Sequence, residues 1–342
     1  MVALPELEPM KAVTADLPRE DGGWGYEVKW DGMRVLAYVN DDRPEAAPLR
    51  LLSGRGREIT NGFPDLADLA AHLAGHRAVL DGEVVAFDEM GRPDFGRLQR
   101  RMHVASVAEA QRRAERVAVT YVMFDLLHLD GSDVSGLPYV QRRHLLSELV
   151  EATAAWSVPA HQEGDGAALL EAVRGRELEG IMAKRLESTY EPGRRSPAWR
   201  KVKVRNRQEV VVGGWTLGSG HRSERPGALL VGVVPNHRVG TGGPITLRYA
   251  GKVGTGFTDA ELTRLLDRLN GLAADRCPFD PRPPPAISRA ARWAHPELVA
   301  EVTYGEWTAD DHLRHPSYVG LRTDKDPAEV VREPTSGYGG RS

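Results

Sequence analysis

The stretch Tyr26-Glu27-Val28-Lys29-Trp30-Asp31-Gly32-Met33-Arg34 decides how the chain is interpreted. A strand-like approach precedes Lys29, and a second strand-like run, 35–39, follows the Asp31-Gly32 pair. Asp-Gly between two apolar runs predicts a β-hairpin, because both turn positions favour positive φ. Lys29 would then end a rigid strand and point into a cleft, where a desolvated amine loses its proton readily and becomes a nucleophile. Taken alone, the pattern is equally compatible with an exposed lysine beside an ordinary turn.

The composition is that of an ordinary soluble protein with room for two domains: 342 residues, 41% hydrophobic and 27% charged. No apolar run approaches the ~20 residues of a membrane span, and the N-terminus lacks a signal-peptide pattern, so we expect a cytoplasmic protein without membrane contact. The single cysteine, Cys277, excludes an internal disulfide and a cysteine-rich zinc cluster. With a net charge of −3, any DNA-binding surface must concentrate its basic residues on one face.

Two glutamates lie within or directly before apolar strands. Glu83 interrupts the run 78–87, and Glu179 precedes the run 180–185. Burying an unpaired carboxylate is costly, and a metal ion, an arginine or a lysine beside it would remove that cost. For Glu83, an outward-facing position on a half-buried strand is an equally open interpretation. The strongest strand, 117–129, is almost continuously apolar, which predicts a central strand covered on both faces.

Basic residues concentrate between Lys184 and Arg207. The alternating run 199–205 places Lys201 and Lys203 on one face with Trp199 and Arg205. A solvated edge strand is one interpretation, because edges are often rich in lysine. Convergence of several cations on one face favours the other, an anion-binding site.

Beyond residue 207 the chain consists of short predicted strands separated by glycine turns. This texture predicts a small β-barrel such as an OB-fold, interrupted by one helix over 258–269. The predicted strands are 210–215, 228–234, 245–253 and 298–304, and helical spacing upstream predicts helices over 63–73, 95–103, 107–116, 139–153 and 167–177. The polar end, 333–342, is expected to be a flexible tail.

Together these segments resemble the ATP-dependent DNA ligases, within the nucleotidyltransferase superfamily that includes mRNA capping enzymes. The motifs that carry the resemblance occur in family order: Lys29-Trp30-Asp31-Gly32-Met33-Arg34, Leu80-Asp81-Gly82-Glu83, Phe124-Asp125, Glu179-Gly180-Ile181-Met182-Ala183-Lys184, Trp199-Arg200-Lys201-Val202-Lys203 and Arg322-Thr323-Asp324-Lys325. The implied fold is α+β, with a nucleotidyltransferase (adenylation) domain, 1–206, followed by an OB-fold β-barrel domain, 207–332. Segments 249–257 and 313–318 look most like the ligase domain of bacterial non-homologous end-joining ligases, in a stand-alone minimal form.

The sequence departs from the family at one position. The family usually has Ser-Arg-x-Gly after the first motif, whereas Ser53-Gly54-Arg55-Gly56 puts glycine where the arginine is expected. A phosphate contact from Arg55 would have to come from one residue further along.

The resemblance implies a reaction in three steps. Lys29 attacks the α-phosphate of ATP to give lysyl-AMP, AMP passes to the 5′-phosphate of a nick in double-stranded DNA, and the 3′-hydroxyl displaces AMP. Glu83 and Glu179 are implied ligands of Mg²⁺ or Mn²⁺. Phe124 is implied to stack on adenine, and Glu27 to accept a hydrogen bond from its amino group.

The remaining implied roles concern phosphates and sugar. Arg34 lies beside the ribose and the nick phosphate, and Trp30 belongs to the same nucleotide site. Lys201 and Lys203 hold the α-phosphate and share in catalysis. Arg322 and the catalytic Lys325 reach the β,γ-phosphates when the OB domain closes, which makes them a device of the first step. The implied setting is DNA repair and recombination by a monomer that associates with the nucleoid when on DNA, with a Ku-type end-binding protein and a repair polymerase as partners.

Other functions compete with this interpretation. An RNA ligase and a GTP-dependent capping-type enzyme share the lysine chemistry, although the C-terminal Arg322–Lys325 motif argues against the capping enzyme. An NAD⁺-dependent ligase is disfavoured because its cysteine zinc module is absent. A catalytically inactive nick-binding module is also disfavoured, since binding alone does not require Lys29 and the paired glutamates.

Overall fold

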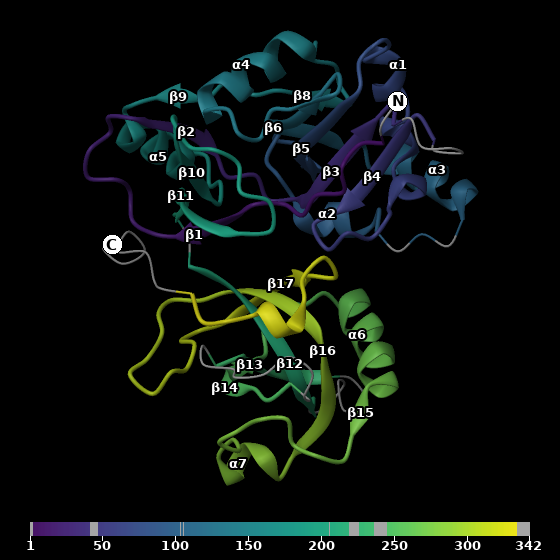
Figure 1. Cartoon of the computed structure of the whole chain (residues 1–342). Coiled ribbons are helices and arrows are strands. Elements are labelled where there is room, and N and C mark those ends of the chain that lie inside the picture. The colour runs from purple at the N-terminus through teal and green to yellow at the C-terminus, as the bar shows by residue number, and fades with distance from the viewer. Residues whose placement is uncertain are drawn as a thin grey trace. The chain divides into compact units, whose positions relative to one another are not determined.

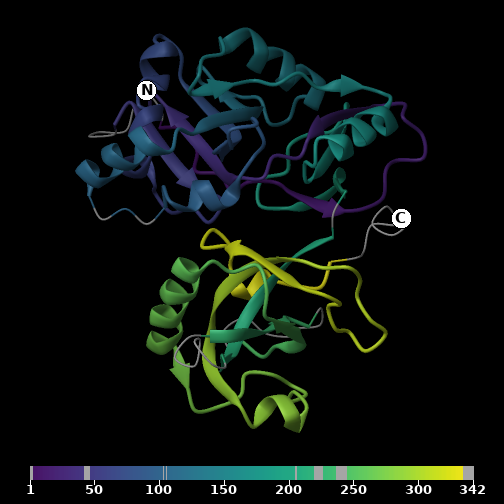
Figure 2. The ribbon, with the colours of Figure 1, turned by 180° about the vertical axis from the view of Figure 1, so that it is seen from behind.

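The computed structural model describes residues 3–41, 47–102, 104, 106–204, 206–218, 226–235 and 245–333. Contacts divide the chain into two compact units, Met1–Val204 and Arg205–Ser342 (Figures 1 and 2). The domain boundary predicted at 206/207 stays a prediction, and the predicted tail lies outside the described residues except for Glu333. In the described parts of the chain, no helix is both long and apolar enough to cross a bilayer.

The first unit is built on two β-sheets (Figure 1). The first sheet has the order β1-β11-β10-β2-β9 and contains β1 (Lys11–Thr14), β2 (Trp24–Val28), β9 (Gln162–Glu163), β10 (Gly180–Arg185) and β11 (Arg195–Lys203). The second sheet has the order β4-β3-β5-β6-β7, with β8 beside β6, and contains β3 (Met33–Val39), β4 (Leu49–Ser53), β5 (Ala78–Val85), β6 (Thr120–Leu129), β7 (Ser132–Asp133) and β8 (Trp156–Ser157). Strand β11 lies between β1 and β10, so the edge-strand interpretation of 199–205 is wrong.

The helices of the first unit are α1 (Leu69–His72), α2 (Phe95–Gln99), α3 (Val107–Arg116), α4 (Tyr139–Leu149) and α5 (Gly166–Gly175). Helix α3 has the predicted bounds. The single helix predicted over 63–73 is wrong: the segment forms 3-10 turns η1 (Thr60–Gly62) and η2 (Pro64–Leu66) before the short α1. Pro64 has no amide hydrogen and begins η2, and the amide of Ala67 closes this turn onto the Pro64 carbonyl at 3.2 Å.

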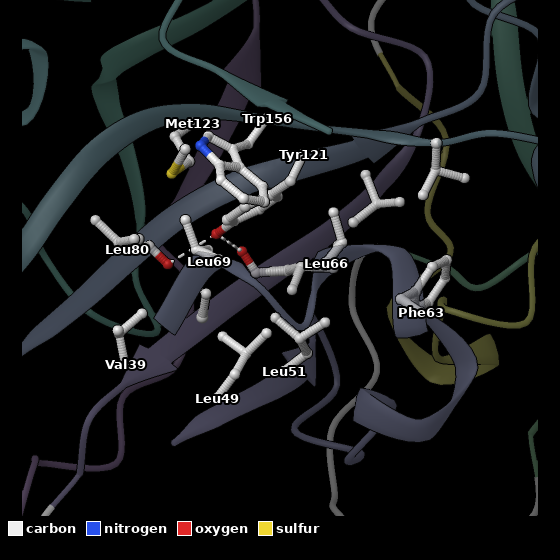
Figure 3. Packing of buried hydrophobic residues seen from close by; sticks show 14 of the residues in the cluster. Val39, Leu49, Leu51, Phe63, Leu66, Leu69, Leu80, Tyr121, Met123 and Trp156 are labelled. Atoms are coloured by element: carbon white, nitrogen blue, oxygen red, sulfur yellow. Dashed lines mark hydrogen bonds between the residues drawn. The ribbon is translucent and has the colours of Figure 1, made fainter. Parts of the chain in front are cut away.

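Three apolar clusters hold the first unit together. The largest packs one face of the second sheet against the surrounding helices, and Figure 3 shows Leu51, Leu66 and Trp156 within it. Its Tyr121 hydroxyl donates to the carbonyls of Val35 and Leu80, both at 3.0 Å. The other two clusters fix the first sheet on both faces. One contains Phe124 and Trp199 together with Leu4, Met10, Leu36, Tyr38, Leu52, Val79, Leu127 and Tyr190. The other contains Trp24, Tyr26, Leu170, Val173, Ile181, Ala183 and Val202.

The hairpin predicted at Asp31-Gly32 is wrong. Strand β2 pairs with β10 and β9, whereas β3 pairs with β4 and β5, so the segment between them crosses from one sheet to the other. Glycine is required at position 32 for space: a Cβ there would lie 2.3 Å from the Val84 carbonyl oxygen. Tertiary packing, rather than turn geometry, explains the glycine at position 32.

The second unit is the OB-fold. Its sheet has the order β14-β13-β12-β16-β15, with β17 beside β16, and contains β12 (Arg207–Leu217), β13 (Pro226–Val233), β14 (Arg248–Val253), β15 (Ala273–Ala274), β16 (Ala291–Thr303) and β17 (Ser317–Leu321). Helix α6 (Asp259–Gly271) runs beside this sheet (Figure 2), and α7 (Pro285–Ser288) and the 3-10 turn η4 (Pro327–Glu329) complete the described elements. Sequence reasoning found α6 and the long strands but missed β17. One apolar cluster, which includes Trp215, Leu265 and Val299, forms the core.

Candidate active site

Lys29 stands directly after β2, where the chain leaves the first sheet. Its amide donates to the Gly180 carbonyl at 2.9 Å, which ties the backbone to the start of β10. Its ammonium donates to Glu179 Oε2 at 2.5 Å. The Lys29 side chain is 21% exposed and that of Glu179 only 3%. The structure therefore brings together the predicted nucleophile and one of the two glutamates predicted as metal ligands.

Strand β11 supplies the predicted cations. Register pairs Lys203 with Gly180, Lys201 with Met182 and Trp199 with Lys184, so these side chains share a face of the first sheet. Lys201 is half-buried and Lys203 is buried. Arg205, predicted on the same face, lies outside the described residues.

Arg34 and Glu83 face one another across β3 and β5 of the second sheet. The Arg34 guanidinium makes a bidentate pair with the buried Asp81, at 2.5 and 2.6 Å, and the Tyr190 hydroxyl donates to the same carboxylate at 2.6 Å. Burial alone lowers the pKa of Arg34, but the Asp81 carboxylate outweighs it and holds that pKa above its ordinary value. Glu83 is half-buried beside this cation, which resolves the cost of placing a carboxylate in the strand.

Glu27 is 3% exposed and lies in a network that sequence reasoning did not anticipate. Lys184 Nζ is 2.7 Å from its Oε2, and Arg143 Nε is 3.5 Å from its Oε1, which also accepts from the Tyr139 hydroxyl. Burial raises the pKa of the Glu27 carboxyl, but Lys184 and Arg143 reverse the effect and hold it below its ordinary value. The carboxylate is thus fixed in its charged form.

Lys184 links this network to the aromatic residues. Its Nζ lies 4.4 Å from the ring centre of Phe124, 4.9 Å from that of Tyr139 and 4.2 Å from that of Trp199. Phe124 is 6% exposed, and the Arg34 Cζ also lies 4.6 Å from its ring centre. The stacking of adenine on Phe124 stays a prediction.

The other predicted residues of the first unit lie at the rim of this arrangement. Trp30 is half-buried and packs edge to face against Phe87, with 6.2 Å between the two ring centres. Gly54, at the position where the family has arginine, packs against the Arg34 stem, and a Cβ there would lie 3.4 Å from the Arg34 Cβ. Arg55 is exposed. Its predicted substitution for the missing arginine stays a prediction.

Arg322 and Lys325 lie in the second unit, in the connection between β17 and η4. The buried Arg322 makes a bidentate pair with Asp324, at 2.9 and 2.8 Å, and its Nη1 is 3.6 Å from Glu301. Lys325 Nζ is 3.3 Å from Glu209. Burial raises the pKa of Asp324, but Arg322 outweighs it, so the pKa is lowered and the pair is charged. The roles of both cations toward ATP phosphates stay predictions.

A metal site was predicted on Glu83 and Glu179. Across the described residues, no group of three or more His, Cys, Asp or Glu side chains is placed to hold a metal ion. Two carboxylates nevertheless suit Mg²⁺ or Mn²⁺, because such ions in nucleotide sites often take one or two protein carboxylates and complete their shell with water and phosphate.

Several site residues were missed or left without a role from sequence. Tyr139 and Arg143 reach Glu27 from α4, far from any motif. A buried tyrosine and paired arginines on a helix give no sequence signal, because such residues are normally exposed. Lys184 was part of a motif but received no role. The position of Lys184 at the end of an apolar strand was the sequence feature that could have indicated a buried lysine with an acidic partner.

A crossover segment that carries an ion-paired lysine between two sheets, followed by an OB-fold, is the architecture of a nucleotidyltransferase. Residues 5–203 match the family model described as ATP dependent DNA ligase domain, and residues 222–325 match that described as ATP dependent DNA ligase C terminal region. The chain therefore belongs to the ATP-dependent DNA ligase family.

Among relatives, the chain is 43% identical to the multifunctional non-homologous end joining protein LigD of Mycolicibacterium smegmatis, over 91% of this chain and 37% of that protein. It is 30% identical to a DNA ligase of Thermococcus fumicolans, over 95% of this chain and 56% of that protein. It thus spans little more than a third of the LigD protein. Among solved structures, mycobacterial DNA ligase D complexed with ATP and MES aligns at a TM-score of 0.67 and 39% identity, covering 96% of this chain and 98% of that one.

Proposed function

We propose that this chain is an ATP-dependent DNA ligase that seals nicks in double-stranded DNA. The observation that carries the proposal is the 2.5 Å contact between Lys29 and Glu179 at the point where the chain crosses between the two sheets. A lysine held there by a nearly buried carboxylate is positioned for attack on a phosphate, and family membership specifies the phosphate donor as ATP.

In the first step, the Lys29 ammonium releases a proton to solvent water, and the amine attacks the α-phosphorus of ATP. The new N–P bond forms as the P–O bond to pyrophosphate breaks. Lys201 and Lys203 neutralise the charge that develops on the α-phosphate, since phosphoryl transfer depends mainly on positioning and electrostatic stabilisation. Glu179 sets the direction of the Lys29 side chain.

The next two steps use the bound DNA. An oxygen of the 5′-phosphate attacks the AMP phosphorus and releases Lys29, and the 3′-hydroxyl then attacks the 5′-phosphate and releases AMP. Arg34, which pairs with Asp81, is the residue we assign to the ribose and the nick phosphate. Trp30 forms part of the nucleotide site, with Phe124 and Glu27 as the predicted adenine contacts.

Glu83 and Glu179 are the residues that would hold Mg²⁺ or Mn²⁺. When bound, the ion supplies charge neutralisation at the phosphates. Arg322 and Lys325 are assigned to the β,γ-phosphates during the first step. Basic residues of both units, including those of 194–207, would contact the DNA backbone without reading its sequence.

The biological setting is part of the proposal. The non-homologous end joining named for the LigD relatives supports repair of double-strand breaks, with a Ku-type end-binding protein and a repair polymerase as partners. We propose that the protein acts as a monomer in the cytoplasm and joins the nucleoid when it is on DNA.

The decisive experiment incubates the protein with ATP labelled at the α-phosphate and resolves the products under denaturing conditions. Wild-type protein should retain the label, Lys29→Ala should not, and Lys252→Ala, an exposed lysine of β14, should behave as wild type. Nick sealing with ATP, GTP and NAD⁺, on DNA and on RNA–DNA nicks, then separates DNA ligase from capping enzyme and RNA ligase. A labelled Lys29→Ala protein would contradict the proposal.

A further inference from the structure

We propose that helix α4 sets the base preference of the nucleotide site through Tyr139, whose hydroxyl holds the Glu27 carboxylate in the position that receives the 6-amino group of a purine. Tyr139 is thus a positioning residue that acts through Glu27. The inference rests on the proposed function, because it assumes that ATP binds beside Lys29.

Among the residues that the structure describes, the Glu27 carboxylate has one hydrogen-bond donor and two ion-pair partners. Oε1 accepts from Tyr139 and lies 3.5 Å from Arg143, whereas Oε2 lies 2.7 Å from Lys184 and has no other partner within the described residues. A carboxylate oxygen accepts about two hydrogen bonds, so Oε2 retains one acceptor position. Glu27 pairs with the half-buried Met182 in the first sheet and stands two residues before Lys29. It therefore lies where a nucleotide attached to Lys29 would place its base.

The charge of Glu27 specifies the chemistry at that position. A carboxylate accepts hydrogen bonds and donates none. The 6-amino group of adenine supplies a donor, whereas the 6-carbonyl of guanine would place a second acceptor against a buried anion. Because the two cations keep Glu27 charged and the Tyr139 hydroxyl holds it in one orientation, the site favours ATP over GTP.

Tyr139 is fixed more firmly than an ordinary helix residue. Its amide donates to the Ser188 carbonyl at 2.8 Å, and the Val140 amide donates to the Leu186 carbonyl at 3.0 Å. One turn along, Arg142 makes a bidentate pair with the buried Asp125, at 2.7 and 2.9 Å. The first turn of α4 is therefore bound to the segment that follows β10, the strand that carries Lys184.

Tyr139 also offers the cleanest substitution in the network. Lys184 packs against three aromatic rings, and Arg143 donates to the carbonyls of Met123 and Pro159, so truncation of either would disturb packing as well as Glu27. Tyr139→Phe removes one hydroxyl and leaves the ring. Burial and the Glu27 carboxylate raise the pKa of Tyr139 well above its ordinary value, so the hydroxyl remains a donor at neutral pH.

The experiment measures initial rates of lysyl-AMP formation against nucleotide concentration, with ATP and with purine riboside triphosphate, which has hydrogen in place of the 6-amino group. We expect Tyr139→Phe to raise KM for ATP about tenfold, the size of one charge-assisted hydrogen bond, with kcat unchanged within about twofold. KM for the analogue should change by less than about twofold, because it makes no bond to Glu27.

The matched control is Tyr121→Phe. Tyr121 is equally buried, but its hydroxyl donates to the Val35 and Leu80 carbonyls on the second sheet (Figure 3), so its removal should leave KM for both nucleotides unchanged. A second test places Tyr139→Phe in a Glu27→Gln background, where it should add no further loss of ATP selectivity. Glu27→Gln alone should reduce the preference for ATP over GTP, which keeps the inference testable even if Tyr139→Phe proves unstable.

Each outcome has a distinct meaning. Equal losses for ATP and the analogue in Tyr139→Phe, or unchanged ATP selectivity in Glu27→Gln, would overturn the role of α4 in base preference while leaving the ligase proposal intact. Absence of any adduct in the wild-type protein would instead overturn the proposed function.

Discussion

The Glu27 network and the Lys29–Glu179 pair are two carboxylate–cation contacts on the same sheet, yet they are built differently. Glu27 is 3% exposed, accepts from Tyr139 and is ion-paired with Lys184 and Arg143, whereas the Lys29 side chain is 21% exposed and its amine donates to Glu179. A buried group with several partners is costly to move, whereas a partly exposed lysine changes partners more easily. We infer that Glu27 is held in a fixed position, whereas Lys29 is free to react.

The strongest test of this distinction is Lys29→Arg. Arginine keeps the positive charge and a contact with Glu179, but its guanidinium does not lose a proton near neutral pH and cannot attack ATP. We expect adduct formation to fall below detection while the melting temperature stays within about 2 °C, because arginine keeps both the charge and the contact with the buried Glu179. Adduct detection by mass spectrometry, with calorimetry for stability, checks both parts. A stable protein that still carries AMP would contradict the assignment.

Asp125→Ala tests the buried contacts that hold α4, and with it Tyr139, in place. This change leaves Arg142 buried without its carboxylate and releases the start of α4, so we expect unfolding of the first unit to become easier by about 3–5 kcal/mol. Denaturant titration followed by tryptophan fluorescence measures the loss. The double variant Asp125→Leu with Arg142→Leu should recover part of it, since no charge is then left unpaired. A single variant as stable as wild type would mean that the pair does not anchor α4.

Glu179→Gln tests the reactive side of the comparison. The amide keeps an acceptor for Lys29 but removes the charge and a predicted metal ligand, so we expect the adenylation rate to fall about 100-fold with little change in stability. The required concentration of Mg²⁺ should rise in parallel. Titration of Mg²⁺ at saturating ATP gives both quantities, and an unchanged requirement would remove Glu179 from the metal site.

The smallest expected effect concerns the second unit. Lys325→Ala should slow adenylation about tenfold, because one cation is lost from the phosphates, and should spare the sealing of nicks that already carry AMP. Glu209→Gln, which removes the acidic partner of Lys325, serves as the counterpart and should not reduce either activity. Equal losses in both assays for Lys325→Ala would contradict a role limited to the first step.

Much of the fold was predictable because apolar periodicity reports burial directly. The central position of β6 follows from such a pattern, because its residues are almost continuously apolar and buried. The Asp31-Gly32 hairpin failed for an identifiable reason: the local sequence suits a turn, but whether two strands pair depends on which neighbours offer better partners. For β2 that neighbour is β10, which lies about 150 residues away in the chain.

The candidate site was predictable where a residue belongs to a motif. Strand alternation predicted that Lys201 and Lys203 share a face, and resemblance assigned Lys29 and Glu179 to the site; the structure pairs Lys29 with Glu179. Tyr139 and Arg143 were not, because their contact with Glu27 depends on how α4 packs against the first sheet. Long-range packing of this kind leaves no mark on local sequence.

The position of Gly32 has a mechanical consequence. Because the segment with Lys29 passes from one sheet to the other against the Val84 carbonyl, the location of the amine depends on the separation of both sheets. Any widening or narrowing between them would shift Lys29 toward or away from the second sheet's Glu83 and Arg34. The position of the Lys29 side chain therefore depends on any movement of the two sheets of the first unit relative to each other.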